Sequence, residues 1–162
     1  RHQELISLNV AGLTAMLAHF VPPMVERGRG RVLNVASIAA FQPVPSLATY
    51  AATKAYVLSL TESLAEELKG TGVSITALCP GITATNMMAT VQAANATMAQ
   101  LPGFLVGDVA AVATQGYAAC MKGEVIRVPG VVNQALALAS RASPKWLLRR
   151  MYGSVGRRTI RG

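Results

Sequence analysis

The sequence is poor in charged residues and contains no long unbroken apolar run. Charged residues make up 14% and hydrophobic residues 52% of the 162 residues, a balance that argues against an intrinsically disordered chain. No unbroken apolar run reaches the roughly 18 residues that a membrane-spanning helix needs, and the first residues show no signal-peptide pattern. These absences favour a folded cytoplasmic domain with a core of its own.

Cysteine is scarce as well. Only Cys79 and Cys120 are present, both in apolar surroundings, and their spacing is unlike that of metal ligands. We therefore expect two buried free thiols in a reducing compartment and no metal site.

Negative charge is missing from the final part of the chain. Up to Glu124, seven basic residues balance seven acidic ones, and eight basic residues follow with no acidic residue among them. These eight are Arg127, Arg141, Lys145, Arg149, Arg150, Arg157, Arg158 and Arg161. The net charge of +8 is thus confined to one segment, and it gives no indication of a nucleic-acid-binding domain.

The rest of the chain alternates between helical and strand patterns. Apolar periodicity and Gly or Pro breaks predict helices at residues 2–26, 48–69 and 108–122, strands at residues 31–36, 73–79 and 124–128, and one or two helices from residue 129. Pro22 and Pro23 should disturb the last turns of the first helix, and Asp108 is the expected N-cap of the third. The strand at residues 31–36 is expected to be short and buried. Helices and strands joined by short loops predict βαβ units and a parallel α/β sheet.

Tyr50 and Lys54 are four residues apart near the start of the second predicted helix. This spacing places them one turn apart on one face, and a cation near a phenol lowers the phenol's pKa from about 10. A tyrosine tuned in this way can exchange a proton with a carbonyl or alcohol oxygen. An ordinary surface pair has the same spacing, so the motif alone leaves both interpretations open.

Two further polar residues precede this pair. Ser37 directly follows the strand at residues 31–36, and ligands of open α/β sheets bind outside the carboxyl ends of the strands. Asn9 is a polar residue within an apolar helix. It either has a functional role, or caps a kink, or simply faces water.

Taken together, these positions resemble a known family. Over residues 4–128 the sequence resembles the short-chain dehydrogenase/reductases, through an Asn-Val-Ala-Ser motif at residues 34–37, the Tyr-x-x-x-Lys pair and a Leu-Cys-Pro-Gly motif at residues 78–81. The catalytic tetrad of that family is matched in order and spacing by Asn9, Ser37, Tyr50 and Lys54. The resemblance implies a partial Rossmann-like fold, a doubly wound parallel sheet in three α/β/α layers.

The resemblance also implies an activity and a role for each residue. The expected reaction is hydride transfer between NADP or NAD and a carbonyl or secondary alcohol, with an apolar small molecule as substrate. Tyr50 would act as general acid in reduction and general base in oxidation, and Lys54 would lower its pKa and bind the nicotinamide ribose. Ser37 would hydrogen-bond the substrate oxygen, and Asn9 would hold a water that links Lys54 to solvent.

The segment after residue 79 resembles the family's grip on the nicotinamide carboxamide. The matching positions are Pro80, Gly81, Thr83 and Thr85, although a strand-ending turn has the same composition. The loop at residues 82–102, with a short helix in it, matches the segment that covers the substrate. Its methionines, Met87, Met88 and Met98, suit either an adaptable apolar pocket or plain core.

The family's Gly-rich phosphate-binding turn has no match in this sequence. Gly28-Arg29-Gly30 does not replace it, because it precedes a strand where the phosphate turn follows one. We therefore expect residues 1–128 to be the catalytic part of a longer domain, truncated at its start, and residues 129–162 to be a basic helical extension. In this family the helix that carries the Tyr-Lys pair and its neighbour commonly pack across a subunit interface, which implies a homodimer or homotetramer.

The basic extension has an amphipathic pattern. Apolar residues Leu147, Leu148, Met151, Tyr152 and Val155 fall on one side of a helix, and Lys145, Arg149 and Arg150 fall on the other with Trp146. Packing of the apolar side on the domain is one interpretation, and attachment to an anionic membrane surface is another. For the whole chain, a non-catalytic binding module of the same fold is the alternative to an enzyme.

Overall fold

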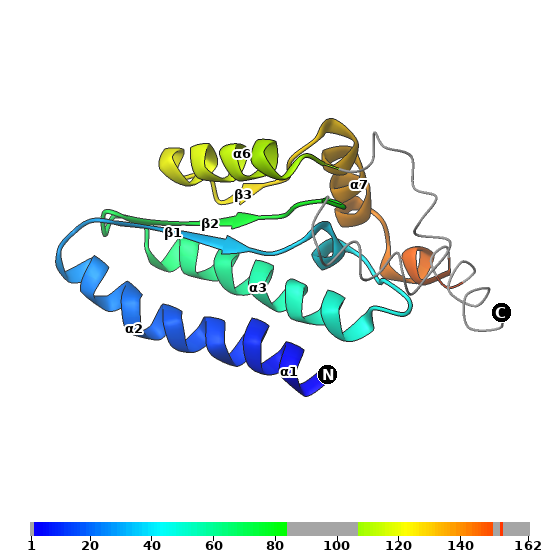
Figure 1. Cartoon of the computed structure of the whole chain (residues 1–162), viewed down its shortest axis with the longest axis horizontal. Helices are drawn as coiled ribbons and strands as arrows, with labels where there is room; N and C mark the ends of the chain where they lie inside the picture. The colour runs from blue at the N-terminus through cyan, green and yellow to red at the C-terminus, as the bar shows by residue number, and fades with distance from the viewer. Residues whose placement is uncertain (1, 84–106, 151–152, 154–162) are drawn as a thin grey trace.

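A computed structural model describes residues 2–83, 107–150 and 153. Within these residues a three-stranded parallel sheet of order β1-β2-β3 lies between helices on both faces (Figure 1). The strands are β1 (Gly30–Val35), β2 (Val73–Leu78) and β3 (Ile126–Arg127). The helices are α1 (His2–Ile6), α2 (Leu13–Glu26), α3 (Ala48–Glu67), α6 (Val109–Lys122) and α7 (Val131–Ala142). The predicted three-layer α/β fold is confirmed.

A single helical run forms the N-terminal part. The π-helix η1 (Ser7–Gly12) joins α1 to α2 without a break. The run continues through Pro22 and Pro23 to Glu26, so the two prolines remove backbone N–H donors from the last turns but do not end the helix.

By length and composition alone, this helical run could cross a membrane. Residues 2–26 contain a window of mean hydropathy 1.6, of which 11% is buried. Asn9, Thr14 and His19 interrupt the apolar residues of this helical run, so the sequence contains no unbroken apolar stretch that would predict a membrane-spanning helix. One such helix is weak evidence, because an apolar helix of a globular protein passes the same test.

The core lies between the sheet and the layer formed by α2 and α3. Leu17 and Val21 of α2 pack with Ile75 of β2, which is 1% exposed. Farther along β2, Ala77 packs with Val57 of α3. The opposite face of β2 is covered by α6, where a Cβ at Gly116 would lie 2.6 Å from the side chain of Leu78. Strand β2 is thus covered on both faces, as a central parallel strand requires.

The expectation that the first strand is buried holds for only one of its faces. Strand β1 is the edge of the described sheet, and Leu33 and Val35 are 37% and 54% exposed. Asn34, between them, points the other way, because its Nδ2 donates to Thr61 Oγ1 of α3 at 2.9 Å. Leu33 and Val35 thus lie on the face of β1 that the described residues leave partly uncovered.

The elements after residue 107 agree in part with the predictions from the sequence. Asp108 caps α6, since its Oδ1 accepts a hydrogen bond from the Ala111 N–H at 2.8 Å. Strand β3 is shorter than predicted and covers only Ile126–Arg127. After α7, residues 145–150 are helical, as the sequence indicated, whereas Met151, Tyr152 and Val155 lie outside the described residues.

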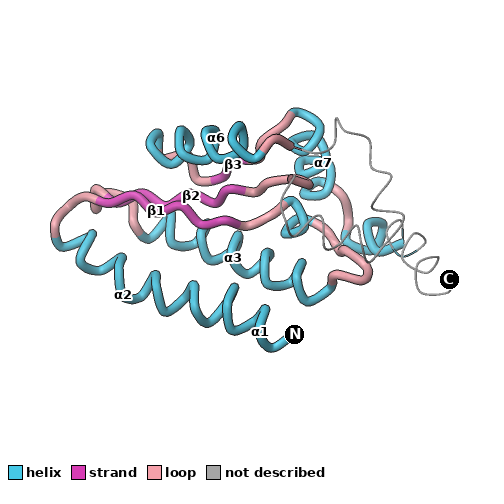
Figure 2. Tube along the Cα trace, in the orientation of Figure 1, coloured by secondary structure: helices cyan, strands magenta, loops and turns pink. Residues whose placement is uncertain are grey.

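The carboxyl ends of β1 and β2 lie together. Val35 is in register with Leu78, and the pairing continues past the strands, where the Ile38 N–H donates to Pro80 O at 3.0 Å. Figure 2 shows the two following loops running side by side at one end of the sheet. The first loop contains the 3-10 helix η2 (Ile38–Phe41). Ser37 lies in the first loop and Pro80 in the second, and Lys54 contacts the last residue of β1.

Candidate active site

Tyr50 and Lys54 lie in the first two turns of α3, which returns along the sheet from the end of β1. The Lys54 Nζ atom donates to the backbone oxygen of Val35, the last residue of β1, at 2.9 Å. The same atom is 5.8 Å from the centroid of the Tyr50 ring. The structure therefore brings the predicted cation and phenol together at the end of a parallel strand.

The Lys54 ammonium is half-buried. Burial lowers its pKa from the ordinary 10.5, and only negative charge on the nearby Cys79 sulfur would oppose this effect. An ammonium has three donors, and the Val35 carbonyl accepts one of them. Lys54 thus has donors left for a polar ligand at this end of the sheet.

Ser37 lies two residues beyond the carbonyl that Lys54 contacts. It is 9% exposed and is the N-cap of η2, where its Oγ accepts from the Ala39 N–H at 3.1 Å. The hydroxyl hydrogen is not used by this contact and can be donated to a ligand oxygen. The sequence showed the position of Ser37 at the strand end but not this capping contact.

Asn9 lies in the middle of the π-helix η1. Single π turns within α-helices are rare and occur frequently at functional sites. The Asn9 side chain neither faces water alone nor caps its own helix, because its Nδ2 donates to Thr53 Oγ1 at 3.1 Å. Asn9 is thereby joined to the helix turn between Tyr50 and Lys54.

Thr53 is a site residue that the sequence analysis missed. It is 3% exposed, and its Oγ1 donates to the Tyr50 carbonyl at 2.8 Å while accepting from Asn9. This hydroxyl fixes η1 against the turn of α3 that carries the phenol. The only sequence signal for this role was a threonine directly before Lys54 and three residues after Tyr50. Threonine is common in helices, so that signal does not single out a site residue.

We expect Thr53→Val to lower the free energy of unfolding by about 1–3 kcal/mol, because the half-buried Asn9 amide and the Tyr50 carbonyl both lose their hydroxyl partner. Thr53→Ser keeps the hydroxyl and is expected to retain most of that stability. Urea unfolding of both variants measures the difference. Equal losses in the two variants would show that the methyl group matters here and the hydroxyl does not.

The predicted cofactor segment is only partly described. The Pro80 carbonyl is bonded to the loop after β1, and Thr83 Oγ1 donates to Gly81 O at 3.1 Å. Thr85 and the methionines Met87, Met88 and Met98 lie outside the described residues. The structure thus places Pro80, Gly81 and Thr83 next to the loop that begins with Ser37.

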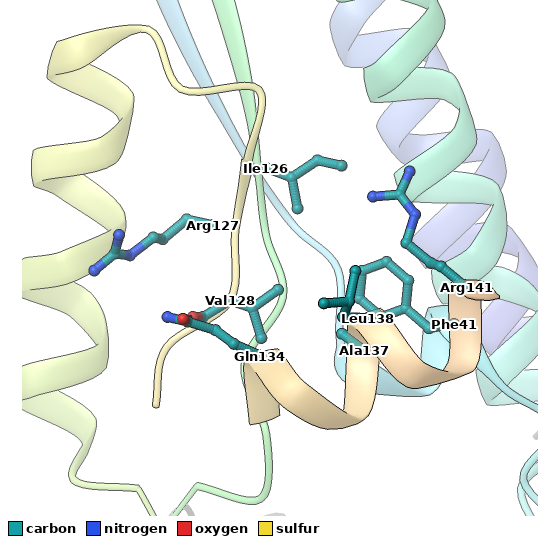
Figure 3. Close-up of a pocket in the computed structure, with 8 residues that line it drawn as sticks. All are labelled: Phe41, Ile126, Arg127, Val128, Gln134, Ala137, Leu138 and Arg141. Carbon is teal, nitrogen blue, oxygen red and sulfur yellow. The ribbon is translucent and has the colours of Figure 1, made fainter. Parts of the chain in front are cut away.

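Helix α7 packs against both loops of the site, which the sequence did not reveal. A Cβ at Gly81 would lie 2.4 Å from the Asn133 side chain, so this position needs glycine for the helix to approach. A cleft of about 280 Å³ lies between α7, β3 and η2. Figure 3 shows its lining residues, among them Phe41, Val128 and Leu138. None of the predicted site residues lines this cleft.

The buried thiol behind the site is unreactive. Cys79 follows β2, is 0% exposed, and burial raises its pKa to about 12, although a hydrogen bond from the Ser37 backbone acts in the other direction. A thiol with so high a pKa has almost no thiolate at neutral pH. Both cysteines are free and buried, as predicted. Among the described residues, no cluster of His, Cys, Asp and Glu could hold a metal ion.

Comparison with known proteins decides the family. The sequence profile described as short chain dehydrogenase matches residues 1–96, more than half of the chain. The chain belongs to the short-chain dehydrogenase family.

Among curated members of this family, an uncharacterized oxidoreductase of Myxococcus xanthus is 40% identical over 90 residues, which are 56% of this chain and 36% of that protein. A solved short-chain dehydrogenase of Burkholderia cenocepacia in complex with NADP superposes with a TM-score of 0.76 at 25% identity, over 94% of this chain and 59% of that one. Another from Sphingobium yanoikuyae, in complex with NADPH, has a TM-score of 0.69 and 29% identity, with 82% and 51% coverage. The chain spans about a third of the length of the curated relatives it matches first.

Proposed function

We propose that this chain is the catalytic part of an NAD(P)-dependent oxidoreductase that transfers hydride between a nicotinamide and a carbonyl or secondary alcohol. The observation that carries the proposal is the position of the Lys54 ammonium, bonded to the last carbonyl of β1 and beside the Tyr50 ring. Two family members with similar structures are described as complexes with NADP and NADPH. Family membership alone supports the broader class, an oxidoreductase.

The residues at the strand ends fit a nicotinamide riboside. Its ribose hydroxyls accept hydrogen bonds, and Lys54 has donors beyond the one that Val35 accepts. Pro80, Gly81 and Thr83 offer backbone groups and a hydroxyl near Ser37, and we propose them as carboxamide contacts together with Thr85. The cofactor, when bound, supplies or accepts the hydride, and this chain's residues supply position and proton transfer.

Proton transfer is assigned to the Tyr50 hydroxyl. In reduction it gives its proton to the substrate oxygen as negative charge develops there, and in oxidation it takes that proton back. The Lys54 ammonium stabilises the negative charge left on Tyr50. Ser37 donates its free hydroxyl hydrogen to the same substrate oxygen. Asn9 holds the η1 segment beside this helix turn, and we propose that it also places the water through which Lys54 exchanges protons.

The experiment that tests the proposal is a titration of this chain with NADPH and with NADH, followed by reduced-nicotinamide fluorescence. We expect weak but saturable binding that Lys54→Met abolishes, because the described residues provide the nicotinamide side of the site. Lys69→Met is the matched control, since Lys69 follows the same helix and pairs with Glu66 on the surface. A folded chain that binds neither nucleotide would favour the alternative, a non-catalytic module of this fold.

An oligomer is a second part of the proposal. The first helical run carries exposed apolar residues, namely Leu8 (73%), Met16 (61%) and Phe20 (51%), and Ile6 (47%), which lines a hollow beside α3. A row of this kind on a globular protein supports a protein interface, and we propose that it packs against the same helices in a homodimer or homotetramer. The two free buried cysteines support a reducing, cytoplasmic location.

A further inference from the structure

Helix α7 is amphipathic in the reverse of the usual sense. Two of its polar side chains bond to distant elements, Ser140 to Gln42 and Arg141 to Glu62. Asn133 and Gln134 bond to the carbonyls of Pro129 and Val128 in the segment that leads into the helix. The polar side chains of α7 are thus hydrogen-bonded, and the bonds of Ser140 and Arg141 join the helix to η2 and α3.

The outer side of α7 is apolar and exposed. Val131 is 81%, Val132 50% and Leu136 44% exposed. Leu138, 70% exposed, lies at the margin of this side, where it also lines the mouth of the cleft. Three alanines of the helix, also exposed, fill the spaces on the same side, so at 100° per residue no polar residue interrupts the arc. A surface helix normally turns such a face to the core, and a continuous exposed apolar face marks an interaction site.

The segment after α7 adds positive charge and a tryptophan. Residues 145–150 are helical, and Leu148, 7% exposed, fixes this turn to the protein. Trp146 is 58% exposed and lies on the same side as Lys145, Arg149 and Arg150, which are also exposed. A tryptophan beside cations, in a segment that follows an apolar helix face in the sequence, is the composition of a segment that lies in a membrane interface.

We propose that α7 and residues 145–150 dock on the surface of an anionic phospholipid bilayer. The charge distribution favours this occupant over a second copy of the chain, because no acidic residue follows Glu124 in the sequence and two such surfaces would repel each other. Figure 1 shows α7 at the carboxyl ends of β1 and β2, so docking would bring the candidate site close to the lipid. The proposal rests on this surface and not on the proposed activity.

Trp146 is the only tryptophan of the chain, so its emission reports on the proposed surface directly. We expect a blue shift and co-sedimentation with vesicles of phosphatidylcholine and phosphatidylglycerol, and neither with phosphatidylcholine alone. Arg149→Gln and Arg150→Gln should each weaken binding about fivefold. Val131→Ser with Leu138→Ser should weaken it about tenfold or more. Tyr117→Ser, at a 66% exposed residue of α6, is the matched control and should bind like the wild type.

Two results would overturn the proposal. One is an unchanged Trp146 emission with anionic vesicles, while far-ultraviolet circular dichroism shows a folded chain. The other is a dimer in the absence of lipid that Val131→Ser with Leu138→Ser dissociates, because the apolar face would then be covered by a second copy.

Discussion

Tyr50→Phe is expected to lower kcat by about 10²–10⁴-fold, the usual contribution of a positioned general acid or base. The substitution removes one hydroxyl oxygen, and Phe keeps the ring that lies 5.8 Å from Lys54 Nζ. Ketone reduction by the natural polypeptide that contains this chain, with a panel of apolar ketones and NADPH or NADH, provides the assay. Substrate and cofactor affinity should change far less than kcat, since the ring and the ammonium stay in place.

A second tyrosine of the same helix provides the control. Tyr56 lies six residues beyond Tyr50 in α3, and its hydroxyl bonds to Thr14 of α2 at 2.6 Å. Tyr56→Phe makes the same chemical change away from the strand ends, so turnover should stay near the wild-type value. Equal activity in Tyr50→Phe and the wild type would remove the proton-transfer role from Tyr50.

The sequence could predict the parts of the site that depend on local geometry. A Tyr-Lys pair four residues apart meets on one helix face wherever the helix lies. A serine directly after a parallel strand lies at the ligand-binding end of the sheet. Both rules hold here without any knowledge of tertiary packing, and they bring Ser37, Tyr50 and Lys54 to the end of β1.

Features that depend on packing between distant segments were not predictable. The hydroxyl of Thr53 matters because Asn9, 44 residues earlier, reaches it from η1. Val35 is 54% exposed because the other described elements leave it uncovered, whereas the apolar residues of β1 alone predict a buried strand. The reversed polarity of α7 arises because Gln42 and Glu62 supply polar partners for its inner side. In each case the deciding contact joins residues far apart in the chain.

Lys54→Met is expected to lower kcat/KM by about 10²-fold or more, because the variant loses the charge proposed to stabilise deprotonated Tyr50 and the donor proposed for the nicotinamide ribose. Met keeps much of the length and apolar stem of the lysine, so the packing at the end of β1 should survive. Lys69→Met on the surface serves as control and should leave turnover unchanged. Loss of activity in both variants would point to a general effect of charge and not to the site.

The same variant has a pH signature in stability that separates burial from catalysis. Burial lowers the pKa of Lys54 in the folded chain below 10.5. At pH values between the folded-state pKa and the unfolded-state pKa, the unfolded chain therefore binds more protons than the folded chain. In that range the free energy of unfolding of the wild type rises with pH. Lys54→Met lacks this gain, and all other groups titrate in both proteins. The free energy of unfolding of Lys54→Met relative to wild type should therefore be highest near neutral pH and fall as pH approaches 10.5. Urea unfolding between pH 7 and about pH 10.5 measures this difference, and a difference independent of pH would show that the ammonium is as well solvated in the folded chain as in the unfolded one.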